Sequence, residues 1–100
     1  MSNDNDNNSL NTPSIKTMIN AVKIALNEDK AIMLDYYLES IKGTCVIGKN
    51  METQEKILAK SDEEYTSPIS KIFKVENEYI IQTENSIYIV SCKIPTKKIS

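Results

Sequence analysis

Three short runs of β-branched and aromatic residues in the second half of the chain constrain the fold more than any other feature. They span Ile69–Val75, Glu78–Thr83 and Ser86–Cys92, and a Glu-Asn pair follows the first and the second run. Residues of these types favour strands, and a short polar pair containing Asn is typical of a tight turn. Consecutive strands joined by such turns predict an antiparallel meander, which tends to curl into a small barrel that hides its edges.

The first third of the chain predicts an amphipathic helix. Thr12-Pro13 suits a helix start, because Thr can cap the first turn and Pro fits the first helical position. The apolar residues that follow form one helical stripe, made of Ile15, Met18, Ile19, Val22, Ala25 and Leu26. This spacing is typical of a helix that packs one side on a core. We therefore expect a helix that ends near residues 27–29 and either caps one open end of the barrel or packs across a face of the sheet.

The middle of the chain changes from a period of 3.6 to a period of 2. Residues 31–41 alternate in this way and predict a half-buried strand, and residues 44–49 and 56–61 predict two more. The expected fold class is α+β, with an N-terminal helix followed by a five- or six-stranded antiparallel meander that curls into a small SH3-like or Sm-like barrel. The expected core consists of Ile15, Met18, Ile19, Val22, Leu26, Ile32, Leu34, Tyr36, Ile47, Ile57, Phe73, Val75, Ile81, Ile87 and Ile89.

The length of 100 residues corresponds to one domain, which we place at residues 13–100. Residues 1–12 contain Asn, Asp and Ser with a single Leu, so we expect a disordered tail that cannot bury enough surface to fold. The tail holds Asp4 and Asp6, which leaves 12 of the 14 acidic residues to balance 12 lysines in the domain. A neutral domain argues against a dominant phosphate-binding surface.

The residue types that most enzymes and metal sites need are missing. The chain has no His, and Cys45 and Cys92 lie in apolar runs that raise a thiol pKa, so neither is a favourable nucleophile. Two cysteines without a CxxC pair do not predict a zinc site or a disulfide framework. We expect no enzyme activity, no cofactor and no metal, and two free thiols in a reducing compartment.

The candidate contact residues fall into two sets. The first set could meet nucleic acid or a protein partner and contains Lys16, Lys23, Lys30, Tyr37, Lys93, Lys97 and Lys98. Its lysines recur every seven residues on the helix and cluster at the C-terminus, although a solvated surface explains them as well. Without Arg, bidentate base reading is lost, so sequence-specific DNA recognition is not expected. Aromatic residues on a small barrel can stack on single-stranded bases, so any nucleic-acid binding would be single-stranded and sequence-nonspecific.

The second set is the uncharged run Ile87-Tyr88-Ile89-Val90. It is either the central buried strand of the sheet or an exposed edge that recruits a partner by strand addition. No signal peptide, lipidation motif or membrane-spanning run is recognised. We therefore expect a soluble intracellular protein of the cytoplasm or nucleus that does not bind membranes.

Two resemblances accompany these patterns. The stretches EDKAIMLDYYLESIKG and YIIQTENSIYIV resemble the opening and closing strands of WYL-type domains, which are ligand- or nucleic-acid-sensing small barrels. The Trp-Tyr-Leu signature and the basic residues of those domains are missing, so no functional residue is carried over. The phrases IMLDYYLES, EEYTSPISKIFKV and EYIIQTENSIYIV are similar to short uncharacterised proteins of large A/T-rich DNA viruses of protists. That resemblance implies a virus-encoded protein, acting in host-cell cytoplasm or packaged in the virion.

Two functions follow as hypotheses. The first is a non-catalytic protein-interaction or structural module that binds a protein partner or self-associates. The alternative is a small-barrel protein that binds single-stranded nucleic acid without sequence preference.

Overall fold

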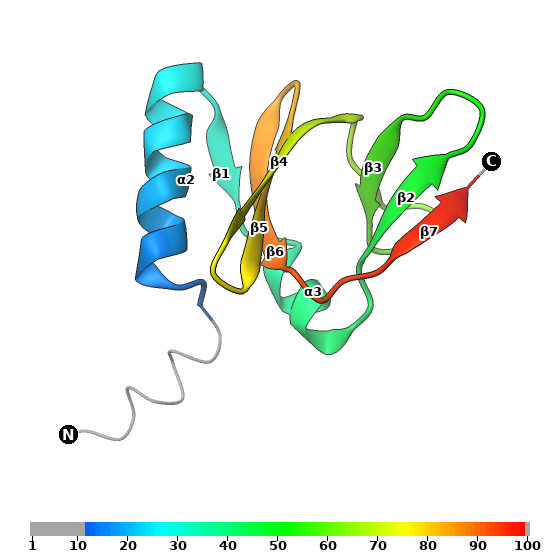
Figure 1. Ribbon diagram of the computed structural model, residues 1–100, viewed down its shortest axis with the longest axis horizontal. Helices are drawn as coiled ribbons and strands as arrows, with labels where there is room; N and C mark the ends of the chain where they lie inside the picture. The colour runs from blue at the N-terminus through cyan, green and yellow to red at the C-terminus, as the bar shows by residue number, and fades with distance from the viewer. Residues whose placement is uncertain (1–11, 100) are drawn as a thin grey trace.

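The computed structural model describes residues 12–99 as one helical layer and two sheet layers (Figure 1). Helix α2 (Ile15–Glu28) covers one face of a four-stranded sheet, and a three-stranded sheet lies on the other side of that sheet. The α+β class is as expected. The predicted tail lies, apart from Thr12, outside the described residues.

The four-stranded sheet contains the predicted meander. Strands β4 (Ile69–Val75), β5 (Glu78–Thr83) and β6 (Ser86–Ser91) pair antiparallel in sequence order, which confirms the meander prediction. Strand β1 (Ala31–Met33) then joins the free side of β6 in parallel. A purely antiparallel sheet was therefore the wrong expectation, because residues 34–85, which include β4 and β5, separate β1 from the strand with which it pairs in parallel.

The second sheet has the order β3-β2-β7. Strands β2 (Val46–Asn50) and β3 (Lys56–Ala59) form a hairpin, and β7 (Thr96–Ile99) pairs with β2 in parallel. No strand was expected at 96–99, where the sequence has two lysines and one Ile. The two sheets are separate hydrogen-bonded ladders among the described residues, and closure into an SH3-like or Sm-like barrel stays a prediction.

The segment after β1 is a helix and not the predicted continuation of a strand. Helix α3 (Tyr37–Lys42) ends at Gly43, whose φ of 84° suits the left-handed C-terminal cap and whose N–H donates to the Glu39 carbonyl. The hydroxyl of Ser40 accepts a hydrogen bond from the β6 backbone N–H of Ser91 at 2.9 Å, which ties α3 to the sheet. As a result Leu34, which was expected in the core, is 45% exposed.

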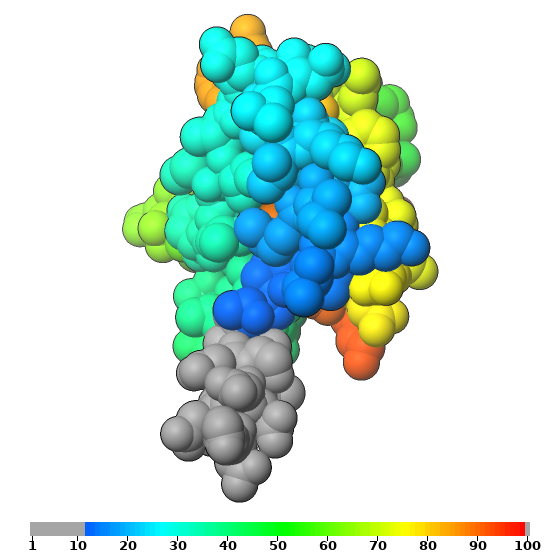
Figure 2. Space-filling model, turned by 90° about the vertical axis from the view of Figure 1, so that its left-hand side faces the viewer, coloured from blue at the N-terminus to red at the C-terminus, as the bar shows by residue number. Residues whose placement is uncertain are grey.

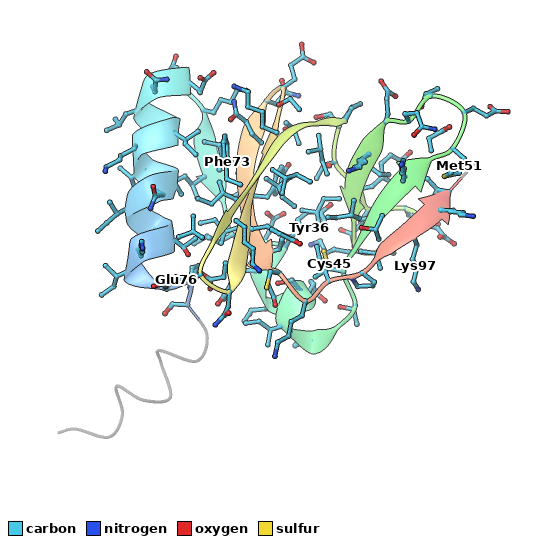
Figure 3. The ribbon with its side chains drawn as sticks, viewed as in Figure 1. Tyr36, Cys45, Met51, Phe73, Glu76 and Lys97 are labelled. Carbon is cyan, nitrogen blue, oxygen red and sulfur yellow. The ribbon has the colours of Figure 1, made fainter. Side chains whose placement is uncertain are left out.

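The core consists of two clusters, one on each side of the four-stranded sheet. Alternation along β5 sends Ile80 toward α2 and Ile81 toward the second sheet. Tyr36 and Cys45 lie between the two sheets, and the Tyr36 ring meets Tyr88 edge-on with centroids 5.3 Å apart (Figure 3). Of the predicted core, five residues are buried, namely Tyr36, Ile47, Ile81, Ile87 and Ile89. The half-buried members are Met18, Ile32, Ile57 and Val75, and the exposed ones are Ile15, Ile19, Val22, Leu26, Leu34 and Phe73.

Candidate interaction surfaces

The apolar stripe of α2 faces solvent. Its outward part, called the helix stripe below, consists of Ile15, Ile19, Val22 and Leu26, whose exposed fractions are 79%, 50%, 43% and 80%. Spacings of four, three and four residues keep these side chains on one side of the helix. The expectation that this stripe packs on the sheet was therefore wrong. Figure 2 shows the face of the molecule on which α2 lies.

The opposite side of α2 packs on the sheet, and it carries small residues. Thr17 and Ala21 are fully buried, and the sheet residues that they approach include Ile80, Ile87 and Ile89. Small side chains let a helix come close to a sheet, and this brings the Thr17 hydroxyl to 3.5 Å from the Val75 carbonyl. Met18 and Ile24 are half-buried against the same cluster, so the sheet-facing side of α2 combines small residues that allow close approach with two large apolar ones.

A polar cluster also holds the start of α2 in this orientation. The carboxylate of Glu78 is buried and accepts a hydrogen bond from the Ser14 backbone N–H at 3.1 Å. The Tyr37 hydroxyl lies 2.8 Å from the other carboxylate oxygen of Glu78 and 3.0 Å from the Thr12 carbonyl. Ser14 also caps the helix through its hydroxyl, which accepts from the Thr17 N–H at 3.1 Å. The predicted cap was Thr12, two residues earlier.

This cluster removes Tyr37 from the candidate contacts. Its side chain is 7% exposed, and burial and the hydrogen bond to Glu78 raise its pKa. A base could not stack on a ring held inside the domain. The prediction that Tyr37 contacts a partner was wrong, because residues 37–42 form a helix that turns this ring inward.

More apolar side chains are exposed beside α2. The segment 31–42 lies next to α2 on the face seen in Figure 2. It carries Leu34, Leu38 and Ile41, with exposed fractions of 45%, 45% and 48%. Helix α2 and the neighbouring segment 31–42 thus both expose large aliphatic groups. Single exposed apolar side chains are normal on a monomer, whereas groups of them mark interaction surfaces.

The candidate lysines do not come together. Lys16 and Lys23 are exposed on α2, whereas Lys30 follows the helix and donates to the Thr83 carbonyl at 2.8 Å. Lys97 and Lys98 lie on β7, in the sheet farthest from α2 (Figures 1 and 3). Lys93 is exposed in the connection between β6 and β7 and belongs to neither the helix lysines nor the β7 lysines. A single basic stripe across the molecule was therefore not formed.

The run Ile87–Val90 is the centre of a sheet and not its edge. Strand β6 pairs with β5 along the whole run and with β1 at Ile87 and Tyr88, and Ile87, Ile89 and Val90 are fully buried. Tyr88 is half-buried between the sheets. Strand addition at this run is therefore excluded, and the buried-strand interpretation is correct.

The two cysteines lie in different surroundings, one buried between the sheets and one half-buried after β6. Burial, and to a smaller extent Glu39, raise the pKa of the Cys45 thiol to about 11. Cys92 is a half-buried free thiol. Within residues 12–99 no group of three or more Cys, Asp or Glu side chains could hold a metal ion, and no helix there is long and apolar enough to cross a membrane.

A second surface, called the sheet hollow below, lies on the outer face of the three-stranded sheet. Its apolar floor consists of Val46, Gly48, Ile57, Ala59 and Ile99, and Tyr65, Lys97 and Lys98 border it. Tyr65 is 59% exposed. Sequence reasoning missed this surface because β7 was not expected. A signal was present, since Val46 and Gly48 share one face of their strand, as do Ile57 and Ala59, which indicates a second apolar face.

No protein-family model, curated protein or solved structure matches this chain. The resemblances to WYL-type domains and to viral proteins therefore stay predictions, and the case for function depends on the surfaces themselves.

Proposed function

We propose that this protein is a non-catalytic protein-interaction module that binds its partner through the helix stripe. The observation that carries the proposal is the exposure of Ile15 and Leu26, 79% and 80%, on a helix that already packs its other side on the four-stranded sheet. Large aliphatic groups lined up on a surface mark interaction sites in soluble proteins. A helix that presents such a row to a partner is a recurring mode of recognition.

The size of the exposed surface sets the strength of the interaction. Complete burial of the helix stripe would contribute about 4–8 kcal/mol, at 1.5–3 kcal/mol for each fully exposed Leu, Ile or Val. Association costs at least about 4 kcal/mol of lost translational and rotational freedom. The helix stripe alone therefore supports weak binding, and a stable complex also needs contacts to Leu34, Leu38 or Ile41.

Among the described residues, the raised pKa of the Cys45 thiol makes it a poor nucleophile, and this supports a role without catalysis. The resemblance to viral proteins would make this a virus-encoded interaction or structural module of the infected cell or the virion. The prediction of an SH3-like or Sm-like barrel has its support in the β4–β5–β6 meander, and an interaction through α2 does not depend on closure of that barrel.

Light scattering and co-purification with the intact chain test this proposal. We expect association, with itself or with another protein, that is lost in the double variant Ile15→Ser/Leu26→Ser. The matched control is Met51→Ser/Tyr65→Ser, which removes two apolar groups exposed by 44% and 59% in or beside the second sheet. A chain that stays monomeric and without a partner at high concentration, or association that both variants retain, would contradict the proposal.

A second candidate function is binding of single-stranded nucleic acid at the sheet hollow. The favourable observation is that the exposed ring of Tyr65 borders the same hollow as Lys97 and Lys98, across the sheet from them, since aromatic rings and cations bind bases and phosphates. The acidic run 62–64 next to Tyr65 opposes it. Binding of a mixed oligonucleotide that weakens steeply with salt and is lost in Lys97→Glu/Lys98→Glu would support this function. No binding at low salt would remove it.

A further inference from the structure

We infer that the partner of the helix stripe is an amphipathic helix of another protein that carries Asp or Glu along one edge, facing Lys16 and Lys23. This inference rests on the proposed function and adds the chemistry of the partner. It follows from the distribution of charge around the stripe.

The two lysines border the same side of the stripe. Lys16 follows Ile15 and Lys23 follows Val22, and their spacing of seven residues places them one above the other on the helix. In a heptad pattern with the helix stripe as the seam, both occupy the flanking position that meets the flank of a partner helix. Both side chains are exposed, and residues 15–27 contain no other charged side chain.

The other side of the stripe is closed by the domain itself. Met18 and Ala25 lie there and are half-buried against the four-stranded sheet. A docking helix therefore has one open flank, and that flank is basic. Opposite charges across an interface fix orientation and exclude wrong partners, so the open flank favours an acidic edge on the partner.

The same geometry disfavours a second copy of this chain as the occupant. In a two-fold symmetric pair of antiparallel α2 helices, the same flank of both helices lies on the same side of the seam. Lys16 and Lys23 of one copy would then lie beside Lys23 and Lys16 of the other, and like charges across a seam repel. The apolar spacing is compatible with such a pair, but the charge pattern is not.

The lysine distribution also favours a protein over a membrane surface. Amphipathic helices that lie in a membrane interface carry Lys and Arg over the polar face opposite their apolar groups. Here the face opposite the stripe packs on the sheet through Thr17 and Ala21, which are both fully buried.

Two synthetic helical peptides with the same leucine seam test the inference with the full-length chain. One has Glu at the flanking positions and the other has Lys, and each is labelled for fluorescence anisotropy at low salt. We expect the Glu peptide to bind about tenfold more tightly, since two surface ion pairs in place of two repulsions are worth roughly 1.4 kcal/mol. The preference should reverse in Lys16→Glu/Lys23→Glu and shrink as salt is raised.

One control variant and two outcomes separate the inference from the proposed function. Lys97→Glu/Lys98→Glu makes the same change of charge on β7 and should leave the preference unchanged. If both peptides bind with equal affinity and Ile19→Ser/Leu26→Ser abolishes this binding, the acidic edge is overturned and the proposed function stands. Binding of neither peptide, together with a monomeric and partnerless chain, would overturn both.

Two further results would also overturn the inference. The first is a dimer in light scattering that Ile19→Ser/Leu26→Ser abolishes, because a second copy would then cover the stripe. The second is co-sedimentation with vesicles of phosphatidylserine and phosphatidylcholine that the same variant abolishes, because the partner would then be a lipid surface.

Discussion

Replacement of Ala21 by Leu tests the rotation of α2 about its own axis. Ala21 lies on the sheet-facing side of α2 and is fully buried against the cluster of Ile80, Ile87 and Ile89. The helix orientation predicted by hydrophobicity would turn Ala21 away from the sheet. Three extra carbon atoms have no free space at this contact, so the helix must shift or the side chains must leave their preferred rotamers. Overpacking of this kind destabilises a protein by about 1–3 kcal/mol.

The counterpart is Leu26→Ser on the other side of the helix. Leu26 is 80% exposed, so only about a fifth of its burial energy, roughly 0.3–0.6 kcal/mol, is lost. The lower helix propensity of Ser adds at most about 0.7 kcal/mol, which keeps the total near 1 kcal/mol. Loss of 1 kcal/mol lowers the midpoint of thermal unfolding by roughly 4–8 °C in a domain of this size.

Urea and thermal unfolding of both variants, followed by far-ultraviolet circular dichroism, measure the difference. We expect Ala21→Leu to be the more damaging change. The opposite order, with Leu26→Ser costing several kcal/mol and Ala21→Leu almost nothing, would show that the helix stripe is buried and would refute the orientation of α2 on which both proposals depend.

Three further predictions concern single groups. Tyr37→Phe should lower the free energy of unfolding by about 1.5–3 kcal/mol in urea titrations, because the buried Glu78 carboxylate loses its hydroxyl donor. Gly43→Ala should cost about 1–2 kcal/mol, measured in the same way, because φ is 84° and open space around the new Cβ leaves backbone strain as the only cause. The Cys45 thiol should resist iodoacetamide until the chain unfolds, as mass spectrometry of the digested protein can show. Above pH 9.0, where an unfolded thiol ionises, the free energy of unfolding should fall, because the folded state keeps the Cys45 proton until about pH 11.

Each of these predictions has its own contradicting result. Tyr37→Phe with unchanged stability would mean that water replaces the hydroxyl beside Glu78. Gly43→Asn tolerates a positive φ and should cost less than Gly43→Ala, so equal losses would argue against strain. Rapid alkylation of Cys45 in the native state would show that the cluster between the sheets opens to solvent.

The meander could be predicted from sequence because local signals agree there. Residues 69–75, 78–83 and 86–91 combine β-forming side chains with short polar turns, and the turn residue Glu76 adopts a positive φ of 54°. The parallel partners β1 and β7 leave no such local signal, since each pairs with a strand far along the chain. The break after Met33 was missed because the burial of Tyr36, Tyr37 and Ser40 depends on contacts with β5 and β6.

The candidate surface was harder to predict than the fold. Periodicity shows that residues 15–28 form an amphipathic helix, but it does not state which side of the helix meets the sheet. Thr17 and Ala21 face inward because they allow close approach and because Ser14, Tyr37 and Glu78 fix the helix start. The contacts of Glu78 with Ser14 and with Tyr37 join residues 64 and 41 positions apart, and no pattern within the helix contains them.

The two parallel pairings also bear on the order in which the chain folds. Ala31 pairs with Ser86 and Ile47 pairs with Thr96, so both ladders close long loops, whereas the turns of the meander join immediate neighbours. Closure of a long loop loses more chain entropy before any contact compensates for it. The β4–β5–β6 meander is therefore the natural nucleus, and β1 can dock only after β6 exists. During synthesis, α2 and β1 emerge long before the strand that holds them, so the apolar stripe of the helix is accessible to other proteins before the domain is complete.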